Sequence, residues 1–263
     1  MSGMLMQKTS AERVLTAVFT GLLLLLTAAA FIRNAVWRDS LAVWQDVVEK
    51  SPGKARPHNN LGDEYAKRDF HEAAMREFRT AVRIDPAYPD AHYNLGNILG
   101  RLERYEEAEQ ELRIAMNLDP RYVLPHSCLG AIYARTGRLE DALREFDAAI
   151  AMSPKDPILY FNRGELYGRQ GRYEEAVREY QVAINVDPDH VDAHNNLGAV
   201  YGKLGRYDAA ATEFQTVISI APGDAAAHYN LGTIYKKLGR FEDAAREYQA
   251  FERLNAPRPE QVP

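Results

Sequence analysis

The segment 191–224, VDAHNNLGAVYGKLGRYDAAATEFQTVISIAPGD, is one copy of a pattern that recurs every 34 residues along the chain. Its Leu-Gly pair and its proline both reappear at that interval. The leucines of the pairs are Leu61, Leu95, Leu129, Leu197 and Leu231, with Arg163 in the remaining slot, and the prolines are Pro52, Pro86, Pro120, Pro154, Pro188 and Pro222. A period of this length indicates supersecondary units stacked in a row rather than one closed globular core.

We number each repeat so that the Leu-Gly pair takes places 7 and 8, which gives six full repeats over residues 55–257. Place 8 is always Gly and place 20 is always Ala, and residues this small let two helices approach closely. Large residues at places 11, 17 and 24 would fill the space between those helices. A glycine such as Gly205 ends the first helix, and the recurring proline marks the turn after the second. Each repeat therefore predicts helix A, a short turn, helix B and a proline-marked turn.

This pattern resembles the tetratricopeptide repeat (TPR), and the resemblance extends over the six repeats of residues 55–257. It implies an all-α fold, a right-handed superhelix built from helix-turn-helix repeats. Departures from the pattern are few. Arg163 stands where Leu is usual at place 7, and we expect its stem to be buried and its charged head to reach solvent.

Composition and motifs argue against several classes of function. The net charge of −5 and the isoelectric point near 5.9 disfavour nucleic acid as the main partner. The single cysteine, Cys128, excludes an intrachain disulfide and does not diagnose the compartment. The sequence has no glycine-rich phosphate loop, nucleophile elbow or zinc motif. We therefore predict that the chain is not an enzyme and uses no cofactor.

Histidine recurs at place 4 in five repeats, which raises the question of a metal site. Helix axes in contact lie about 8–10 Å apart, whereas the nitrogen ligands of one zinc ion lie about 2 Å from it. One histidine per repeat is therefore a spacing for packing, and we predict no metal site. The five residues are His58, His92, His126, His194 and His228.

The residues before the first full repeat contain one long apolar run. Residues 14–32 carry no charge, follow an N-terminal flank of residues 1–13, and would form a helix of roughly 28 Å at 1.5 Å per residue. Two interpretations compete: an uncleaved single-pass membrane anchor, and a signal peptide cut after Ala30. The length of the run and the flanking Arg33 favour the anchor. Basic residues on both sides leave its orientation open.

The segment 35–54 predicts a capping half-repeat. Counting back from Pro52 places Trp37, Ser40 and Trp44 at places 17, 20 and 24, the positions of a lone helix B near residues 37–50. Such a helix would cover the apolar end of the first full repeat, because terminal repeats need covering. At the other end, residues 258–263 are too polar and proline-rich for a helix and predict a disordered tail.

No further helix follows the last helix B, so we expect Tyr248 and Phe251 to form an exposed apolar end and a candidate surface for self-association.

The stretch 33–39, followed by Ser51-Pro52 and by residues 58–62, resembles a particular junction. It is similar to the join between the last membrane helix and the TPR array in membrane proteins related to protein O-mannosyltransferases. This resemblance implies an array on the periplasmic, non-cytoplasmic side of a membrane. It implies no transferase activity for this chain.

Two polar rows on helix A predict the binding face. Asn at place 6 and Lys or Arg at place 13 are seven residues apart, two turns along one helix face. An amide offers a donor and an acceptor to a peptide backbone, and a basic group offers donors to carboxylates. The place 6 row, interrupted by Cys128, resembles the peptide-gripping surface of TPR arrays such as that of O-GlcNAc transferase. The rows are Asn60, Asn94, Asn162, Asn196 and Asn230, and Lys67, Arg101, Arg135, Arg169, Lys203 and Lys237. The alternative is that they are consensus surface residues that maintain solubility.

Apolar residues at places 2 and 5 of the middle repeats predict the centre of that face. Leu124, Ile158 and Phe161 lie near Cys128 between more polar ends, the arrangement of a binding hot spot with a rim. The alternative is that neighbouring helices cover part of this apolar surface.

Two functions follow as hypotheses. The first is a membrane-anchored scaffold that binds an extended or acidic segment of another protein in the concave groove. The second is an accessory component of a membrane glycosyltransferase system, of the O-mannosyl or O-GlcNAc type, that presents protein acceptors. The junction at residues 33–39 favours the second hypothesis, and the lack of catalytic motifs favours the first.

Overall fold

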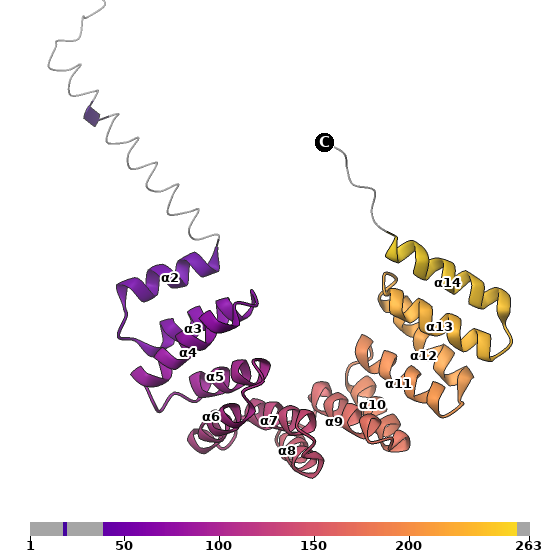
Figure 1. The fold of residues 1–263 in the computed structure, drawn as a ribbon, viewed down its shortest axis with the longest axis horizontal. Helices are drawn as coiled ribbons and strands as arrows, with labels where there is room; N and C mark the ends of the chain where they lie inside the picture. Colours follow the sequence, from indigo (N-terminus) through magenta and orange to yellow (C-terminus); the bar gives the residue numbers. More distant parts are fainter. Residues whose placement is uncertain (1–17, 20–38, 257–263) are drawn as a thin grey trace, which may run out of the picture. The chain divides into compact units, whose positions relative to one another are not determined.

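The computed structural model of this chain describes residues 18–19 and 39–256. Residues 39–256 fold into thirteen α-helices and contain no strand, which confirms the predicted all-α array of helix-turn-helix repeats (Figure 1). The helices are α2 (Ser40–Lys50), α3 (Ala55–Ala66), α4 (His71–Ile84), α5 (Pro89–Arg101), α6 (Tyr105–Leu118), α7 (Val123–Arg135), α8 (Leu139–Met152), α9 (Pro157–Arg169), α10 (Tyr173–Val186), α11 (Val191–Lys203), α12 (Tyr207–Ile220), α13 (Ala225–Lys237) and α14 (Phe241–Asn255). The right-handed superhelical course stays a prediction.

The chain divides into two compact units, residues 1–111 and 112–263. Within each, the odd-numbered helices from α3 are the A helices of the repeats and the even-numbered helices from α4 are the B helices. Helix α2 precedes them and packs on α3.

Helices A and B of one repeat approach closely because place 8 carries no side chain. A Cβ atom built on Gly62 would lie 2.7 Å from the Phe78 ring, and one on Gly130 would lie 2.8 Å from the Phe146 ring. The place 24 ring therefore rests directly on the backbone of helix A. The alanines at place 20, such as Ala142, are fully buried beside it. The small and large places predicted from the period thus meet at the same interface.

The turn between helices A and B has a left-handed residue at place 15. Gly137, Gly171, Gly205 and Gly239 have φ between +73° and +80°. The first two repeats use Asp69 (φ 59°) and Glu103 (φ 61°) at this place. Since a side chain disfavours this conformation, the packing of helix B on helix A must impose it in those two repeats.

Helix α2 is held to α3 by polar contacts as well as by packing. The Ser40 hydroxyl donates to the Glu64 carboxylate, and Arg68 donates to Asp39 at 2.7 Å. The hydrogen bond from Ser40 lowers the pKa of Glu64. Burial acts to raise that pKa, whereas Lys67 and Arg68 lower it further. A charged Glu64 is therefore the form that holds the start of α2.

Helices A and B are also joined by hydrogen-bonded histidine–glutamate pairs. In five repeats the place 4 histidine Nδ1 lies 2.6–2.7 Å from the place 23 glutamate Oε2. In four of these repeats the histidine Nε2 also lies 3.0–3.4 Å from the carbonyl oxygen of the preceding proline. The pairs are His58–Glu77, His92–Glu111, His126–Glu145, His194–Glu213 and His228–Glu247.

The fourth repeat replaces this pair with a different one. Tyr160 stands at place 4 and donates its hydroxyl hydrogen to the Pro154 carbonyl at 3.0 Å. Glu179, at place 23, is instead bound by Arg163 through contacts of 3.0 and 2.8 Å. The expectation that the Arg163 head reaches solvent is therefore wrong, because its side chain is only 18% exposed and its guanidinium binds Glu179 and Asp147.

The two residues named for the apolar end of the last repeat are only partly exposed, and self-association through this end stays a prediction. Tyr248 and Phe251 are half-buried, and their rings pack on Tyr229 at centroid distances of 5.8 and 5.2 Å. A shallow hollow on α14 is lined by Arg246, Gln249, Glu252, Arg253 and Ala256. Place 28, which is Val, Met or Ile in the five earlier repeats, is Glu252 here. The α14 surface is therefore polar where earlier repeats carry an apolar side chain.

Among the helices of residues 39–256 none combines the length and apolar character that a membrane crossing requires. The predicted membrane segment 14–32 lies outside the described residues except for Val18 and Phe19, as does the predicted tail 258–263.

Candidate functional site

The two predicted polar rows occupy equivalent positions on every A helix. The place 6 asparagines are half-buried. The place 13 lysines and arginines are exposed, near the C-terminal end of the same helix. Each A helix except α7, which has Cys128 at place 6, thus presents an amide and, two turns later, a positive charge.

In the second compact unit these residues line two small hollows. The first hollow has a volume of about 200 Å³ and lies between α7 and α9; its lining includes Arg135, Asn162 and Arg169. The second, also about 200 Å³, lies between α9 and α11; its lining includes Arg169, Asn196 and Lys203. Five of the residues predicted from sequence therefore come together over three consecutive A helices.

Glu165 lines both hollows, and the sequence analysis did not single it out. It is at place 9, one turn before Arg169. Glu165 is an exposed residue, but partial desolvation by its neighbours raises its pKa; the charge of Asp192 acts in the same direction, and Arg169 and Asn196 oppose it. The sequence contains one sign of this residue's special position: within this unit, place 9 is charged only in the fourth repeat of the chain. The other repeats of the unit have Ala131, Ala199 and Thr233 there.

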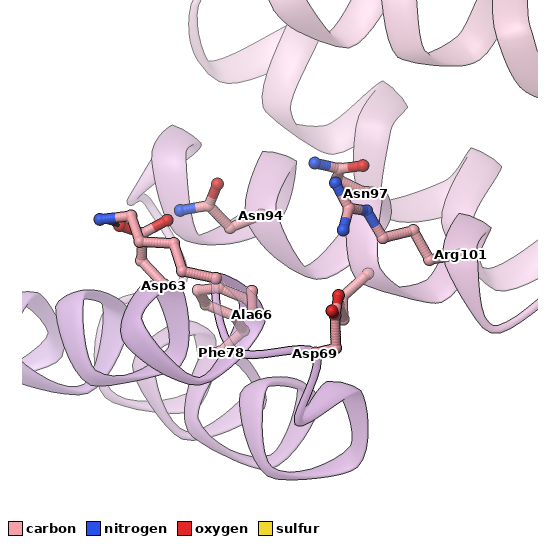
Figure 2. A pocket seen from close by; sticks show the side chains of 9 residues that line it. Asp63, Ala66, Asp69, Phe78, Asn94, Asn97 and Arg101 are labelled. Carbon is pink, nitrogen blue, oxygen red and sulfur yellow. Dashed lines mark ion pairs between the residues drawn. The ribbon is translucent and has the colours of Figure 1, made fainter. Parts of the chain in front are cut away.

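The first compact unit contains a larger hollow of about 330 Å³ between α3 and α5 (Figure 2). Figure 2 shows Asp63 and Ala66 on one side and Asn94, Asn97 and Arg101 on the other. The predicted residues Asn94 and Arg101 therefore share this hollow. Its charged residues balance, because Asp63 and Asp69 offset Lys67 and Arg101, and Lys67 is paired with Asp63 at 2.7 Å.

Part of the asparagine row is used inside the fold. Asn94 Nδ2 donates to Asn59 Oδ1 at 3.0 Å, and Asn162 Nδ2 donates to Ser127 Oγ at 3.4 Å. Asn196 lies close enough to Glu165 and Tyr180 to lower the pKa of both groups. These amides therefore link neighbouring repeats, and a ligand would compete with those bonds. Asn60 and Asn230 are not among the residues that line these three hollows.

The predicted apolar set does not line either hollow of the second unit. Leu124 is 47% exposed and Ile158 is 55% exposed, both in the first turn of their A helices. Phe161 is half-buried, with its ring stacked on His190 at 5.1 Å and tilted against Tyr180 at 5.9 Å. Leu124 and Ile158 are thus available to a ligand, whereas Phe161 already has aromatic partners.

The residues that the structure describes contain no group of three histidine, cysteine or carboxylate side chains close enough to hold a metal ion. The place 4 histidines, which drew attention in the sequence, are instead the partners of the place 23 glutamates. Histidine and glutamate of each pair are 19 residues apart in the sequence, a spacing that does not by itself identify them as partners.

Comparison with protein families matches most of the chain. The family described as "TPR repeat" matches residues 62–103, 132–171 and 169–205. Those described as "Tetratricopeptide repeat" match residues 195–259 and 89–122. No curated protein matches the chain.

Solved structures share the fold at low sequence identity. Cut9–Hcn1, a hetero-tetramer of the APC/C, is 20% identical with a TM-score of 0.69; the match covers 86% of this chain and 44% of that one, so the chain spans less than half of it. PilW, a type IV pilus biogenesis factor, is 23% identical with a TM-score of 0.69, covering 78% and 95%. YrrB, a TPR protein with an unusual peptide-binding site, is 22% identical with a TM-score of 0.51, covering 70% and 95%.

Proposed function

The chain belongs to the tetratricopeptide repeat family, and we propose that it is a scaffold that binds an extended, acidic segment of another protein. The binding face is the one formed by α7, α9 and α11 in the second compact unit. One observation carries the proposal: Arg135, Arg169 and Lys203 line two adjoining hollows on consecutive A helices. Carboxylates are the natural partners of such groups, because charge-assisted hydrogen bonds are the stronger ones.

The size of the hollows favours a peptide over a small molecule. Each measures about 200 Å³, whereas sites for drug-sized ligands usually measure about 300–1,000 Å³. A hollow of this size takes one side chain. Two hollows in series therefore suit a chain that places one side chain in each. The peptide-binding site named for YrrB supports this class of ligand.

Apolar contacts would add affinity beside the charged ones. Leu124 and Ile158 are half-exposed or more at the start of α7 and α9. Burying each side chain under a ligand is worth roughly 1.5–3 kcal/mol. Phe161 is a poorer probe, since its removal would disturb the stacking with His190 as well as any ligand contact. The apolar contribution is therefore best tested at Leu124 and Ile158.

The proposed scaffold is attached to a membrane by residues 14–32, with the repeats on the non-cytoplasmic side. This part of the proposal rests on the sequence pattern. The alternative function, an accessory component of a glycosyltransferase system, predicts that crosslinking in native membranes captures a membrane transferase.

The test measures binding of a fluorescent, glutamate-containing peptide to the full-length chain in detergent. Arg135→Ala/Arg169→Ala should weaken binding at least tenfold, a change of about 1.4 kcal/mol or more, and added salt should weaken binding of the wild-type chain. The control, Arg144→Ala/Arg178→Ala, removes the same charge from exposed positions on α8 and α10. An equal loss in the control, at equal folded stability, would show that the hollows are not the binding site.

A further inference from the structure

We propose that the face formed by α7, α9 and α11 selects a peptide with two acidic residues three positions apart and no acidic residue between them, and that Glu165 enforces this spacing. This inference rests on the proposed function and specifies the ligand of the same site. It follows from the order of charges along the two hollows, the distance between neighbouring A helices, and the position of one carboxylate.

The charges along the two hollows alternate. Arg135 lines only the first hollow and Lys203 only the second, whereas Glu165 and Arg169 line both. The two outer helices of the site therefore each contribute a positive group, Arg135 from α7 and Lys203 from α11. The central helix α9 contributes Glu165 and, four residues later, Arg169. The Lys203 ammonium also lies over the Tyr173 ring at 5.2 Å.

The central carboxylate is incompletely compensated. Its partners are the Asn196 amide and the charge of Arg169, and the nearby Asp192 repels it. Glu165 is exposed where it lines the two hollows, and its charge and that of Asp192 repel a ligand carboxylate that approaches it. A ligand group that faces Glu165 is therefore favoured when it donates a hydrogen bond, as a backbone N–H does, and disfavoured when it is a carboxylate.

Helix spacing sets the separation of the two acidic side chains. The A helices of neighbouring repeats contact each other, as the Asn162–Ser127 hydrogen bond between α9 and α7 shows. Axes of packed helices lie about 8–10 Å apart. A chain in the polyproline II conformation has three residues per turn and rises about 3.1 Å per residue, so residues i and i+3 point the same way about 9 Å apart. Acidic residues at i and i+3 would thus enter successive hollows, with the backbone between them passing Glu165.

The experiment compares two capped peptides of equal composition, binding to the full-length chain in detergent at low salt. One has glutamates at i and i+3, the other at i and i+1, and alanines fill the other positions. The wild-type chain should bind the i, i+3 peptide at least fivefold more tightly. Glu165→Gln keeps the shape of the side chain and removes its charge. In this variant the preference should fall at least twofold, because the i, i+1 peptide binds more tightly. The part of the preference that comes from the spacing of the helices should remain.

Glu140→Gln is the matched control, because it removes one negative charge from an exposed position on α8 and should keep the wild-type preference. Equal binding of the two peptides by the wild-type chain overturns the spacing rule and leaves the proposed function intact. An unchanged preference in Glu165→Gln removes Glu165 from its role. Failure of the folded wild-type chain to bind either peptide overturns the proposed function itself, and the spacing rule with it.

Discussion

Five repeats have a histidine at place 4. In four of them, both ring nitrogens of the histidine lie within hydrogen-bond distance of an oxygen acceptor. For His92 these are Glu111 at 2.6 Å and the Pro86 carbonyl at 3.0 Å. A carbonyl oxygen can only accept, so the ring satisfies both partners when both nitrogens carry hydrogen. Burial lowers the pKa of His92, but the hydrogen bonds to Glu111 and Pro86, with the charges of Glu111 and Asp85, outweigh burial, and the pKa is raised above its usual value.

Stability should therefore fall as pH rises through the raised pKa of His92. A group whose pKa is higher in the folded state contributes stability that is fully present below its unfolded pKa and is lost above its folded pKa. We expect the free energy of unfolding, measured by urea titration, to decrease as the pH rises above about 6.5, the usual pKa of histidine. His92→Gln should reduce that decrease. A variant as pH-dependent as the wild type would show that this ring does not carry the effect.

The fourth repeat offers a test of how the place 23 glutamate is satisfied. Glu179 and Arg163 are only 14% and 18% exposed, so Arg163→Leu leaves a largely buried carboxylate without its main partner. We expect a loss of about 1.5–3 kcal/mol in the free energy of unfolding, the usual value for a hydrogen bond to a charged group. Adding Tyr160→His recreates the pair found in the other repeats and should recover at least half of that loss. If the changes in the free energy of unfolding caused by Arg163→Leu and Tyr160→His are simply additive, the histidine does not replace the arginine as the partner of Glu179.

The turn between helices A and B contains a left-handed residue at place 15. Gly205 has φ +73° and open space around its Cβ position, so only backbone conformation opposes a side chain there. Gly223 also has open space but lacks a positive φ. The two glycines thus separate conformational strain from crowding.

Gly205→Ala should lower the free energy of unfolding by about 1–2 kcal/mol, the usual cost of this conformation for a residue with a Cβ. Gly223→Ala, the control, should change it by less than about 0.5 kcal/mol. Thermal and urea unfolding followed by circular dichroism would measure both. Equal effects of the two substitutions would mean that the turn relaxes to accommodate alanine.

From α2 to α5, and again from α7 to α14, each helix contacts its neighbour in sequence, and the A helices of adjacent repeats contact each other within these two stretches. Stability in such an array is approximately a sum of repeat and nearest-neighbour contributions. Helix α2 begins at Ser40, a few residues after the predicted membrane segment 14–32, and is bound to α3. A membrane anchor would therefore connect to the first repeat with little slack.

We expect the full-length chain to remain in the membrane pellet after alkaline extraction. Leucine contributes about −0.3 to −0.6 kcal/mol near the centre of an inserted helix, and residues 14–32 are rich in leucine. Deletion of residues 1–33 is the control, and this variant should be released. A mature N-terminus at Phe31 in the purified protein would instead establish the signal peptide.

The periodic pattern alone was enough to predict the alternation of A and B helices, their turns and the helix face that carries the polar rows. It succeeded because these features depend on residues close in sequence: a small residue at place 8, a large one at place 24 and a glycine at place 15. The same pattern also picked out Arg135, Arg169 and Lys203. It could not show that Glu165 stands between them, because that depends on the packing of three A helices from different repeats.

The partners of individual side chains could be identified only from the tertiary structure, because they depend on contacts between helices. The partners of His92 and Glu179, and the stacking of Phe161 on His190, join residues on different helices. A place number assigns each of these side chains to a helix face but does not identify the group opposite. Arg163 shows the difference: its place predicted a head in solvent, whereas packing of α9 beside α8 and α10 brings that head between two carboxylates. Local periodicity thus determines which faces exist, and the distances between packed helices determine which polar groups on those faces remain available to a ligand.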